Sequence, residues 1–354
     1  MASAEHFTRF KVMNFKRFET FEMDNLGQFN VIVGDNNVGK SSILEALMID
    51  PKVEIFLQSL KYILFNVKRF DELKDSYLYH YLNQNTNNKT GVIKLEAYLN
   101  ENPEANWRLE IHIRTGHLEG IKSNLPQRDS DLHAGSKNGL IENSLSPAST
   151  QNIEIEENAN IHPPFIPFQV GYRHNLATYF DANIEGKTAR LNQLKSDLKI
   201  LIPDLTDIRQ RSSEARTTIL AISREGANQP MPLGTYGDGV IKLFRILVEM
   251  QIHSGNRLMI DEIDTGIHYK RMKLFWQTVI RSAKNNNVQL FTTTHNEECI
   301  WAFTEALKEE GEEFQNASRI IHLGQVSEKT KQVKAYNYKY NEFAHALDVG
   351  NELR

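Results

Sequence analysis

The strongest chemical pattern of the sequence is an eight-residue stretch near its start. Residues 34–41 read GDNNVGKS, so Gly34 and Gly39 frame a loop that ends in Lys40 and Ser41. Backbone N–H groups of such a loop curl around phosphate oxygens, and the helix that follows offers them its positive end. The lysine would reach the β- and γ-phosphates of a nucleotide, and the serine hydroxyl would ligate Mg²⁺. The residues of this predicted phosphate site are Gly34, Asp35, Asn36, Asn37, Val38, Gly39, Lys40, Ser41 and Ser42.

The flanking sequence provides the elements that this loop needs. The run FNVIV at 29–33 predicts a buried strand, and the apolar residues of 41–47 have the spacing of one helix face. A glycine loop between a strand and a helix is the context in which this pattern binds phosphate, so a chance match is a poor explanation.

Two adjacent carboxylates follow another apolar run, LMI at 258–260. Asp261 at the strand tip would hold the metal through water, and Glu262 would polarise the attacking water as general base. Acidic residues at strand ends are common and are usually only solvated. The assignment of this pair therefore depends on the phosphate loop.

Two further elements could contact the same phosphates. His295 follows the buried run at 288–293, one strand–helix–strand step after Asp261, and could donate a hydrogen bond to a γ-phosphate. The turn GTYGDG at 234–239 opens a helix and could cradle the nucleotide of a partner subunit. A structural histidine and a plain capping turn are the alternatives.

Hydrophobic periodicity predicts an α/β fold with a mixed or parallel core sheet, an antiparallel β subdomain and a helical lobe. The predicted divisions are an N-terminal lobe over 1–115, a polar surface loop over 116–164, a helical lobe over 165–229 and a C-terminal lobe over 230–354. Strands are expected at 7–15, 29–33, 91–100, 106–115, 257–260 and 288–293. Helices are expected at 41–47, 51–88, 187–224, 240–253, 270–284 and 296–309.

Composition narrows the class of protein. The 354 residues include 41 Lys or Arg and 45 Asp or Glu, and the net charge of -4 argues against a wholly basic nucleic-acid binder. A single cysteine, Cys299, excludes an internal disulfide and fits a reducing compartment. No run approaches the ~20 apolar residues of a membrane span, and the first residues lack the apolar core of a signal peptide. We therefore expect a cytoplasmic protein with no membrane partner.

Five sequence blocks together resemble the ATP-binding-cassette (ABC) class of P-loop ATPases. Within that class they look most like short AAA-family proteins related to the overcoming-lysogenization-defect (OLD) and RecF-like ATPases. The blocks are VMNFKRFETF, NVIVGDNNVGKSSILEAL, PLGTYGDGVIKLFRIL, MIDEIDTGIH and QLFTTTHNEECIWAF. They lie within residues 8–50 and 230–310, and the middle of the chain matches only in its order of strands and helices.

This resemblance implies ATP and Mg²⁺ as cofactors and gives the residues above their roles in ATP hydrolysis. It also places Lys16 near the nucleotide, and it matches Thr235 and Gly237 to the signature motif. Gly266 and His268 fall in the D-loop, which in the class touches the opposing subunit. Gln169 is the candidate for a glutamine that joins the metal shell.

The resemblance further implies a nucleotide-dependent switch that works as a homo-oligomer, a dimer or a multiple of dimers, with ATP at the interface. Too few residues follow His295 for the Toprim nuclease domain of OLD proteins. This implies a separate effector chain, such as a nuclease or toxin, in anti-phage defence. An ATP-stabilised scaffold with little turnover and a RecF-type DNA-repair ATPase are the alternatives. Residues 187–224 hold eight basic and four acidic side chains, which leaves open DNA or an acidic protein as a partner, or a merely solvated helix face.

Overall fold

The computed structural model describes residues 6–50, 59–60, 62–68, 81–82, 91–99, 107–114, 117–124, 162–212, 217–223, 230–326 and 332–350. The chain divides into two compact units. We call Glu5–Phe165 with Arg319–Tyr338 the P-loop unit, and Ile166–Ser318 with Lys339–Leu353 the carboxylate unit. No helix in the described ranges is long and apolar enough to cross a membrane.

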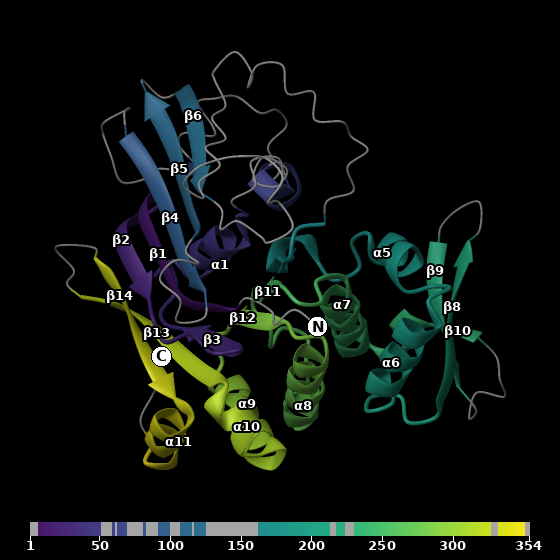
Figure 1. Ribbon diagram of the computed structural model, residues 1–354. Helices are drawn as coiled ribbons and strands as arrows, with labels where there is room; N and C mark the ends of the chain where they lie inside the picture. The colour runs from purple at the N-terminus through teal and green to yellow at the C-terminus, as the bar shows by residue number, and fades with distance from the viewer. Residues whose placement is uncertain are drawn as a thin grey trace, which may run out of the picture. The chain divides into compact units, whose positions relative to one another are not determined.

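The P-loop unit contains a five-stranded antiparallel sheet in the order β2-β1-β4-β5-β6 (Figure 1). Alternate residues of its strands are buried, as in β4, because one face of the sheet packs on the core. The antiparallel strands predicted from period-two alternation are confirmed. The strands are β1 (Phe7–Phe15), β2 (Phe18–Met23), β4 (Gly91–Leu99), β5 (Trp107–Arg114) and β6 (His117–Asn124).

Strand β6 corrects the sequence prediction, which began a surface loop at residue 116. Residues His117–Asn124 pair with β5, with Ile121 opposite Ile111 and both side chains buried. The strand was missed because its apolar residues are few and interrupted by Gly120. Residues 125–161 of the predicted loop lie outside the described residues.

The phosphate loop of this unit joins β3 (Phe29–Val33) to helix α1 (Lys40–Met48). All five residues of β3 are buried, as its unbroken apolar run predicted. Strands β13 (Ser318–Gln325) and β14 (Val333–Lys339) continue from β3 in the order β14-β13-β3. Of the helix predicted at 51–88, the description includes the short π-helix η1 (Tyr62–Val67), and most of the rest lies outside it.

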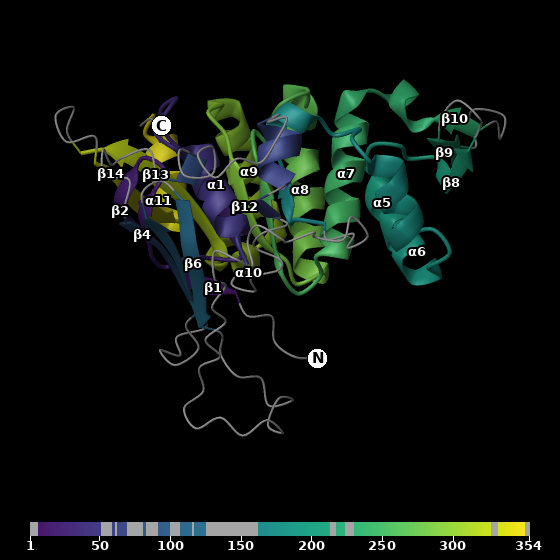
Figure 2. The same ribbon diagram turned by 90° about the horizontal axis from the view of Figure 1, so that it is seen from above.

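In the carboxylate unit, β11 (Arg257–Ile260) and β12 (Gln289–Thr293) pair in parallel, so both strands end at the same edge. The two-residue strand β7 (Phe165–Ile166) is the other neighbour of β11. Helix α7 (Asp238–Ile252) lies between α8 (Tyr269–Asn285) and α6 (Thr188–Leu198), as Figures 1 and 2 show. The remaining helices are α5 (Leu176–Asn183), α9 (Glu297–Glu310), α10 (Glu312–Asn316) and α11 (Tyr340–Asp348).

The helix predicted over 187–224 is wrong beyond Leu198. A three-stranded antiparallel sheet follows, in the order β10-β9-β8, from β8 (Leu205–Ser212), β9 (Thr217–Ser223) and β10 (Pro230–Pro232). Pro203 stops the helical run, and the TTILAIS sequence of β9 is rich in β-branched residues that favour strands.

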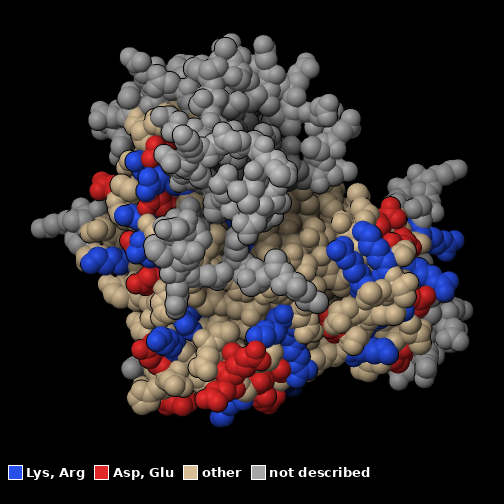
Figure 3. All heavy atoms as spheres, in the orientation of Figure 1, with Lys and Arg blue, Asp and Glu red and all other residues tan. Residues whose placement is uncertain are grey.

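Charge on the carboxylate unit is partly neutralised by ion pairs. Basic side chains gather around α6 and β8, whereas basic side chains of α8 lie beside acidic ones of α9 and α10 (Figure 3). In the first region Asp207 pairs with Arg209 at 2.8 Å and with Lys195 at 3.6 Å. Asp207 is already one of the four acidic residues counted in 187–224, so these ion pairs leave the net charge of the segment unchanged.

Candidate functional site

The phosphate loop needs glycine at both of its ends. Gly34 and Gly39 have φ angles of 137° and 110°, which side chains rarely tolerate. A Cβ on Gly34 would lie 2.5 Å from the carbonyl oxygen of Leu323, and one on Gly39 would lie 2.5 Å from Cζ of Phe18. The loop is thus packed against β13 and against the turn between β1 and β2.

The side chain of Lys40 bends back over this loop. Its ammonium group donates hydrogen bonds to the carbonyl oxygens of Gly34, at 2.6 Å, and Asp35, at 3.0 Å. Asp35, Asn36 and Asn37 are exposed, and Lys40 is partly exposed. Ser41 and Ser42 of the first helical turn are also partly exposed, so the loop and the helix start are open to a ligand.

Lys16, predicted near the nucleotide, is a buried residue in the turn between β1 and β2. It forms an ion pair with Glu45 of α1, and its ammonium lies 4.0 Å from the ring centre of Tyr81. Tyr81 also donates a 2.6 Å hydrogen bond to Glu45, and Lys68 lies 3.1 Å from the same carboxylate. Burial, and the charge of Lys68, hold the pKa of Lys16 well below its usual value. Contact between Lys16 and a nucleotide stays a prediction.

The end of β11 carries the predicted carboxylates of the other unit. Asp261 is buried, with 4% of its surface exposed, and accepts a 2.6 Å hydrogen bond from the hydroxyl of Thr293. The same hydroxyl accepts a 2.9 Å hydrogen bond from the N–H of Glu262. One side chain at the end of β12 therefore contacts both the predicted metal ligand Asp261 and the predicted general base Glu262.

Glu262 has a left-handed backbone, with a φ angle of 49°. Its carboxylate is partly exposed and accepts a 3.4 Å hydrogen bond from the hydroxyl of Thr265. Its carbonyl oxygen accepts a 2.9 Å hydrogen bond from the ammonium of Lys242. The backbone of Glu262 is thus firmly held, while its carboxylate can still reach a ligand.

Two buried groups that the sequence analysis missed lie beside this strand end. Burial lowers the pKa of Lys242 to about 7, although the charges of Asp264 and Glu262 oppose the shift. Burial and the nearby carboxylates, Asp261 foremost, raise the pKa of Tyr172. The Tyr172 hydroxyl has no hydrogen-bond partner among the residues with described side chains. Lys242 lies in a mostly apolar helix and Tyr172 lies in a loop. Neither the residue types nor their spacing predicted that these two groups would lie at this site.

The remaining predicted residues of this unit occupy exposed positions. Gln169 lies in the short 3-10 turn η4 (Phe168–Val170), just after Ile166, whose carbonyl oxygen accepts a 3.0 Å hydrogen bond from the Asp261 N–H. His295 lies two residues beyond Thr293 and is exposed. The structure therefore brings the polypeptide around Gln169, Asp261 and His295 to one edge of the sheet.

The predicted signature residues precede α7. Thr235 is exposed in the turn η5 (Leu233–Tyr236), where its hydroxyl donates a 2.8 Å hydrogen bond to the carbonyl oxygen of Pro232. Gly237 is exposed at the start of α7. In the predicted D-loop, Gly266 and His268 are exposed, and the His268 ring stacks on Tyr269 with ring centres 4.6 Å apart.

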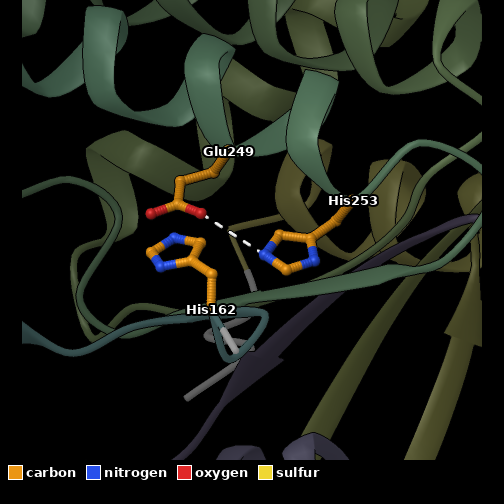
Figure 4. Close-up of side chains that lie close together, drawn as sticks. All are labelled: His162, Glu249 and His253. Atoms are coloured by element: carbon orange, nitrogen blue, oxygen red, sulfur yellow. Dashed lines mark ion pairs between the residues drawn. The ribbon is translucent and has the colours of Figure 1, made fainter. Parts of the chain in front are cut away.

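The opposite end of α7 holds a buried polar cluster. Arg245 donates a 2.6 Å hydrogen bond to Glu249, whose other carboxylate oxygen lies 3.4 Å from Nε2 of His253. Figure 4 shows Glu249 and His253 side by side, one turn apart on the helix. Arg245 also lies over the ring of Tyr179, with its guanidinium carbon 4.6 Å from the ring centre. The contact between Arg245 and Tyr179 joins α7 to α5.

Three comparisons with known proteins agree with this fold. The chain is 23% identical over 348 residues to a Helicobacter pylori protein named "ATP/GTP phosphatase", covering 89% of this chain and 91% of that protein. It is similar in fold to an SMC head bound to the C-winged helix domain of ScpA, with a TM-score of 0.58, 13% identity and coverage of 96% and 99% of the two chains.

A second SMC head, solved with an extended coiled coil and the C-terminal domain of ScpA derived from Pyrococcus furiosus, gives a TM-score of 0.55 at 11% identity. That alignment covers 97% of this chain and 99% of the other. The chain thus has the α/β fold of SMC and ABC-type ATPase heads. A family profile described as "AAA domain, putative AbiEii toxin, Type IV TA system" matches residues 29–300, and the chain belongs to that AAA family.

Proposed function

We propose that this protein binds ATP with Mg²⁺ and hydrolyses it to ADP and phosphate. The observation that carries the proposal is the different environment of two adjacent carboxylates. Asp261 is buried and oriented by Thr293, as a metal-binding group needs, whereas Glu262 has a fixed backbone and an accessible carboxylate, as a general base needs. The phosphate loop at residues 34–41 would bind nucleotide phosphates.

The donor atoms proposed for Mg²⁺ suit a hard cation. The hydroxyl of Ser41 and the side-chain oxygen of Gln169 would bind the ion directly and a carboxylate oxygen of Asp261 would hold it through water, so all three donors are oxygen atoms. When bound, Mg²⁺ would neutralise charge on the β- and γ-phosphates. Three oxygen donors leave room for phosphate and water, as Mg²⁺ sites usually do.

The chain's own groups would then perform the reaction as follows. Lys40 exchanges the carbonyl oxygens of its loop for phosphate oxygens, and N–H groups at the start of α1 bind the same phosphates. Glu262 accepts a proton from the attacking water, and His295 donates a hydrogen bond to the γ-phosphate. The relative named "ATP/GTP phosphatase" supports nucleotide hydrolysis. The preference for ATP over GTP rests on the resemblance to ABC-class ATPases.

Hydrolysis would serve a switch. In this proposal Thr235 and Gly237 contact the nucleotide of a second copy, so that ATP joins two subunits and hydrolysis releases them. The state of the dimer would control a separate effector, a nuclease or a toxin, in anti-phage defence. The two SMC heads of similar fold were solved bound to ScpA domains, which supports a partner protein for this fold.

Glu262→Gln tests both parts of the proposal. The variant should lose at least about 100-fold in ATP turnover and still bind ATP, because the amide keeps the shape of the side chain but cannot accept the proton. Its mass in solution should rise to that of a dimer, or a multiple of dimers, with ATP and Mg²⁺. Glu305→Gln, a substitution at an exposed position of α9, is the matched control and should behave as wild type.

Each outcome has a clear meaning. Unchanged turnover in Glu262→Gln would remove Glu262 from its role as general base. A single mass with and without nucleotide would instead favour the scaffold, in which ATP stabilises an oligomer that forms without it. A partner that proves to be DNA, with an affinity that falls steeply with salt, would favour the RecF-type alternative.

A further inference from the structure

Helix α7 is connected to the turn after β11 by one buried side chain. The ammonium of Lys242 donates hydrogen bonds to two carbonyl oxygens of that turn, Glu262 at 2.9 Å and Thr265 at 2.8 Å. Only 1% of the Lys242 surface is exposed. Within the turn, the N–H of Thr265 also donates a 3.2 Å hydrogen bond to the carbonyl oxygen of Glu262. The two hydrogen bonds of Lys242 therefore add to one that already closes the turn.

A second contact joins the same two segments closer to the start of α7. A Cβ built on Gly239 would lie 3.4 Å from the carbonyl oxygen of Gly266 and 3.4 Å from Cδ1 of Ile267. The first turn of α7 is therefore packed directly on the predicted D-loop. Any displacement of α7 along or around its axis must be accommodated by the turn that carries Glu262.

A lysine is a costly residue at this position. Its neighbours in the helix are buried from Val240 to Gln251, and burying an ammonium group is unfavourable unless its donors are satisfied. Two carbonyl oxygens and the ring of Tyr172, whose centre is 4.6 Å away, satisfy it here. A methionine would fill the same volume without the charge, so packing alone does not explain the lysine.

We propose that Lys242 is a positioning residue that couples the signature helix α7 to the general base Glu262. Its two hydrogen bonds hold the turn in which Glu262 has its left-handed backbone conformation and stays partly exposed. A nucleotide that contacts Thr235 and Gly237 and moves α7 thereby changes the position of the Glu262 backbone. The inference rests on the proposed hydrolysis for its kinetic consequence, but the link itself exists in the protein without nucleotide.

Lys242→Met removes both donors and keeps the length of the side chain. Amide hydrogen exchange should accelerate at least fivefold in peptides spanning Asp261–Tyr269 and stay unchanged in peptides of α9. In steady-state kinetics, kcat should fall at least tenfold while KM for ATP changes less than threefold, because nucleotide binding at the phosphate loop is untouched. Lys242→Arg keeps the charge and the donors and should recover at least a third of the wild-type kcat.

Lys308→Met, at a largely exposed position of α9, is the control for loss of a lysine and should match wild type in both measurements. If Lys242→Met does not fold, Lys242→Gln replaces it, since its shorter amide cannot reach both carbonyl oxygens and should give a smaller loss of kcat at constant KM.

Wild-type kcat in the folded variant, or equal acceleration of exchange throughout the carboxylate unit, would overturn the role of Lys242. Absence of ATP turnover in the wild-type protein would instead overturn the proposed function, and it is detected before any variant is made. The exchange measurement decides whether the hydrogen-bonded link exists in either case.

Discussion

The hydroxyl of Thr293 donates a 2.6 Å hydrogen bond to Oδ1 of Asp261, and both groups are buried at the ends of adjacent parallel strands. That hydroxyl also accepts a hydrogen bond from the N–H of Glu262, so its one donor and one of its two acceptor positions are used at this site. The neighbouring strand therefore sets the orientation of the proposed metal ligand and of the residue after it.

Thr293→Val should impair both catalysis and stability. The substitution keeps the shape of the side chain but leaves the Asp261 oxygen and the Glu262 N–H without this partner. We expect turnover to fall about 10- to 100-fold, and the free energy of unfolding to fall by about 1–3 kcal/mol, the cost of unsatisfied buried polar groups. Steady-state kinetics and chemical denaturation measure the two effects.

Thr292→Val is the matched control for this prediction. Thr292 is equally buried, and its hydroxyl has no hydrogen-bond partner within the described part of the chain. Its replacement should leave turnover unchanged and should not lower the free energy of unfolding. Equal losses in the two variants would show that packing in β12, rather than the hydrogen bonds of Thr293, is what matters.

The sequence predicted the strands of this site better than the contacts between them. The runs before Asp261 and before His295 predicted buried strands, and they form the parallel pair β11 and β12. Thr293 belongs to one of these runs, but a hydroxyl in a buried strand carries no sign of which residue it will contact. The partner of the Thr293 hydroxyl can be identified only from the register in which β11 and β12 pair.

Lys242 and the residues after Leu198 show two other limits of sequence patterns. Lys242 lies in a helix that is buried on nearly all sides, so periodicity predicts the helix and not the partner of the charge. Residues 205–212 and 217–223 fall within the predicted helix, yet they form the antiparallel strands β8 and β9, whose pairing buries Ile208 and Ile219. The β-branched residues of β9 already favour a strand, so the helix prediction gave too little weight to local preference there.

Gly39→Ala should abolish nucleotide binding. Ala at this position would be strained by the φ angle of 110° and would lie 2.5 Å from Cζ of Phe18, so the loop must change shape. Gly186→Ala is the control, because Gly186 also has a positive φ, of 76°, but has open space around it. That variant should lose about 1 kcal/mol of stability and keep wild-type ATP affinity. Isothermal titration with ATP separates the two effects.

The pair of Lys16 and Glu45 should be essential for stability. Each side chain is almost fully buried, so removing Lys16 leaves the buried Glu45 carboxylate paired only with Lys68, which is partly exposed. We expect Lys16→Met to lower the free energy of unfolding by about 3–5 kcal/mol. Lys68→Met removes a partly exposed neighbour of the same carboxylate and should cost about 1 kcal/mol or less.

ATP affinity distinguishes the structural role of Lys16 from the predicted nucleotide contact. Glu45→Gln removes the other member of the pair without changing Lys16. If the lysine acts only through Glu45, the two variants should lose stability alike and affect ATP binding alike. A loss of ATP affinity specific to Lys16→Met would support direct contact with the nucleotide.

Cys299 should be unreactive in the folded protein. The thiol is fully buried on α9, and burial together with the charge of Asp264 raises its pKa to about 12. At pH 8 roughly one thiol in 10,000 would be ionised, against about a quarter for a cysteine of ordinary pKa, and only the thiolate reacts with a disulfide reagent.

We expect no reaction with Ellman's reagent over an hour in buffer and one equivalent within minutes in guanidinium chloride. Because the sequence contains a single cysteine, this reaction would report opening of the core around α9 directly. Rapid labelling of the native protein would show that this core opens far more often than its burial indicates.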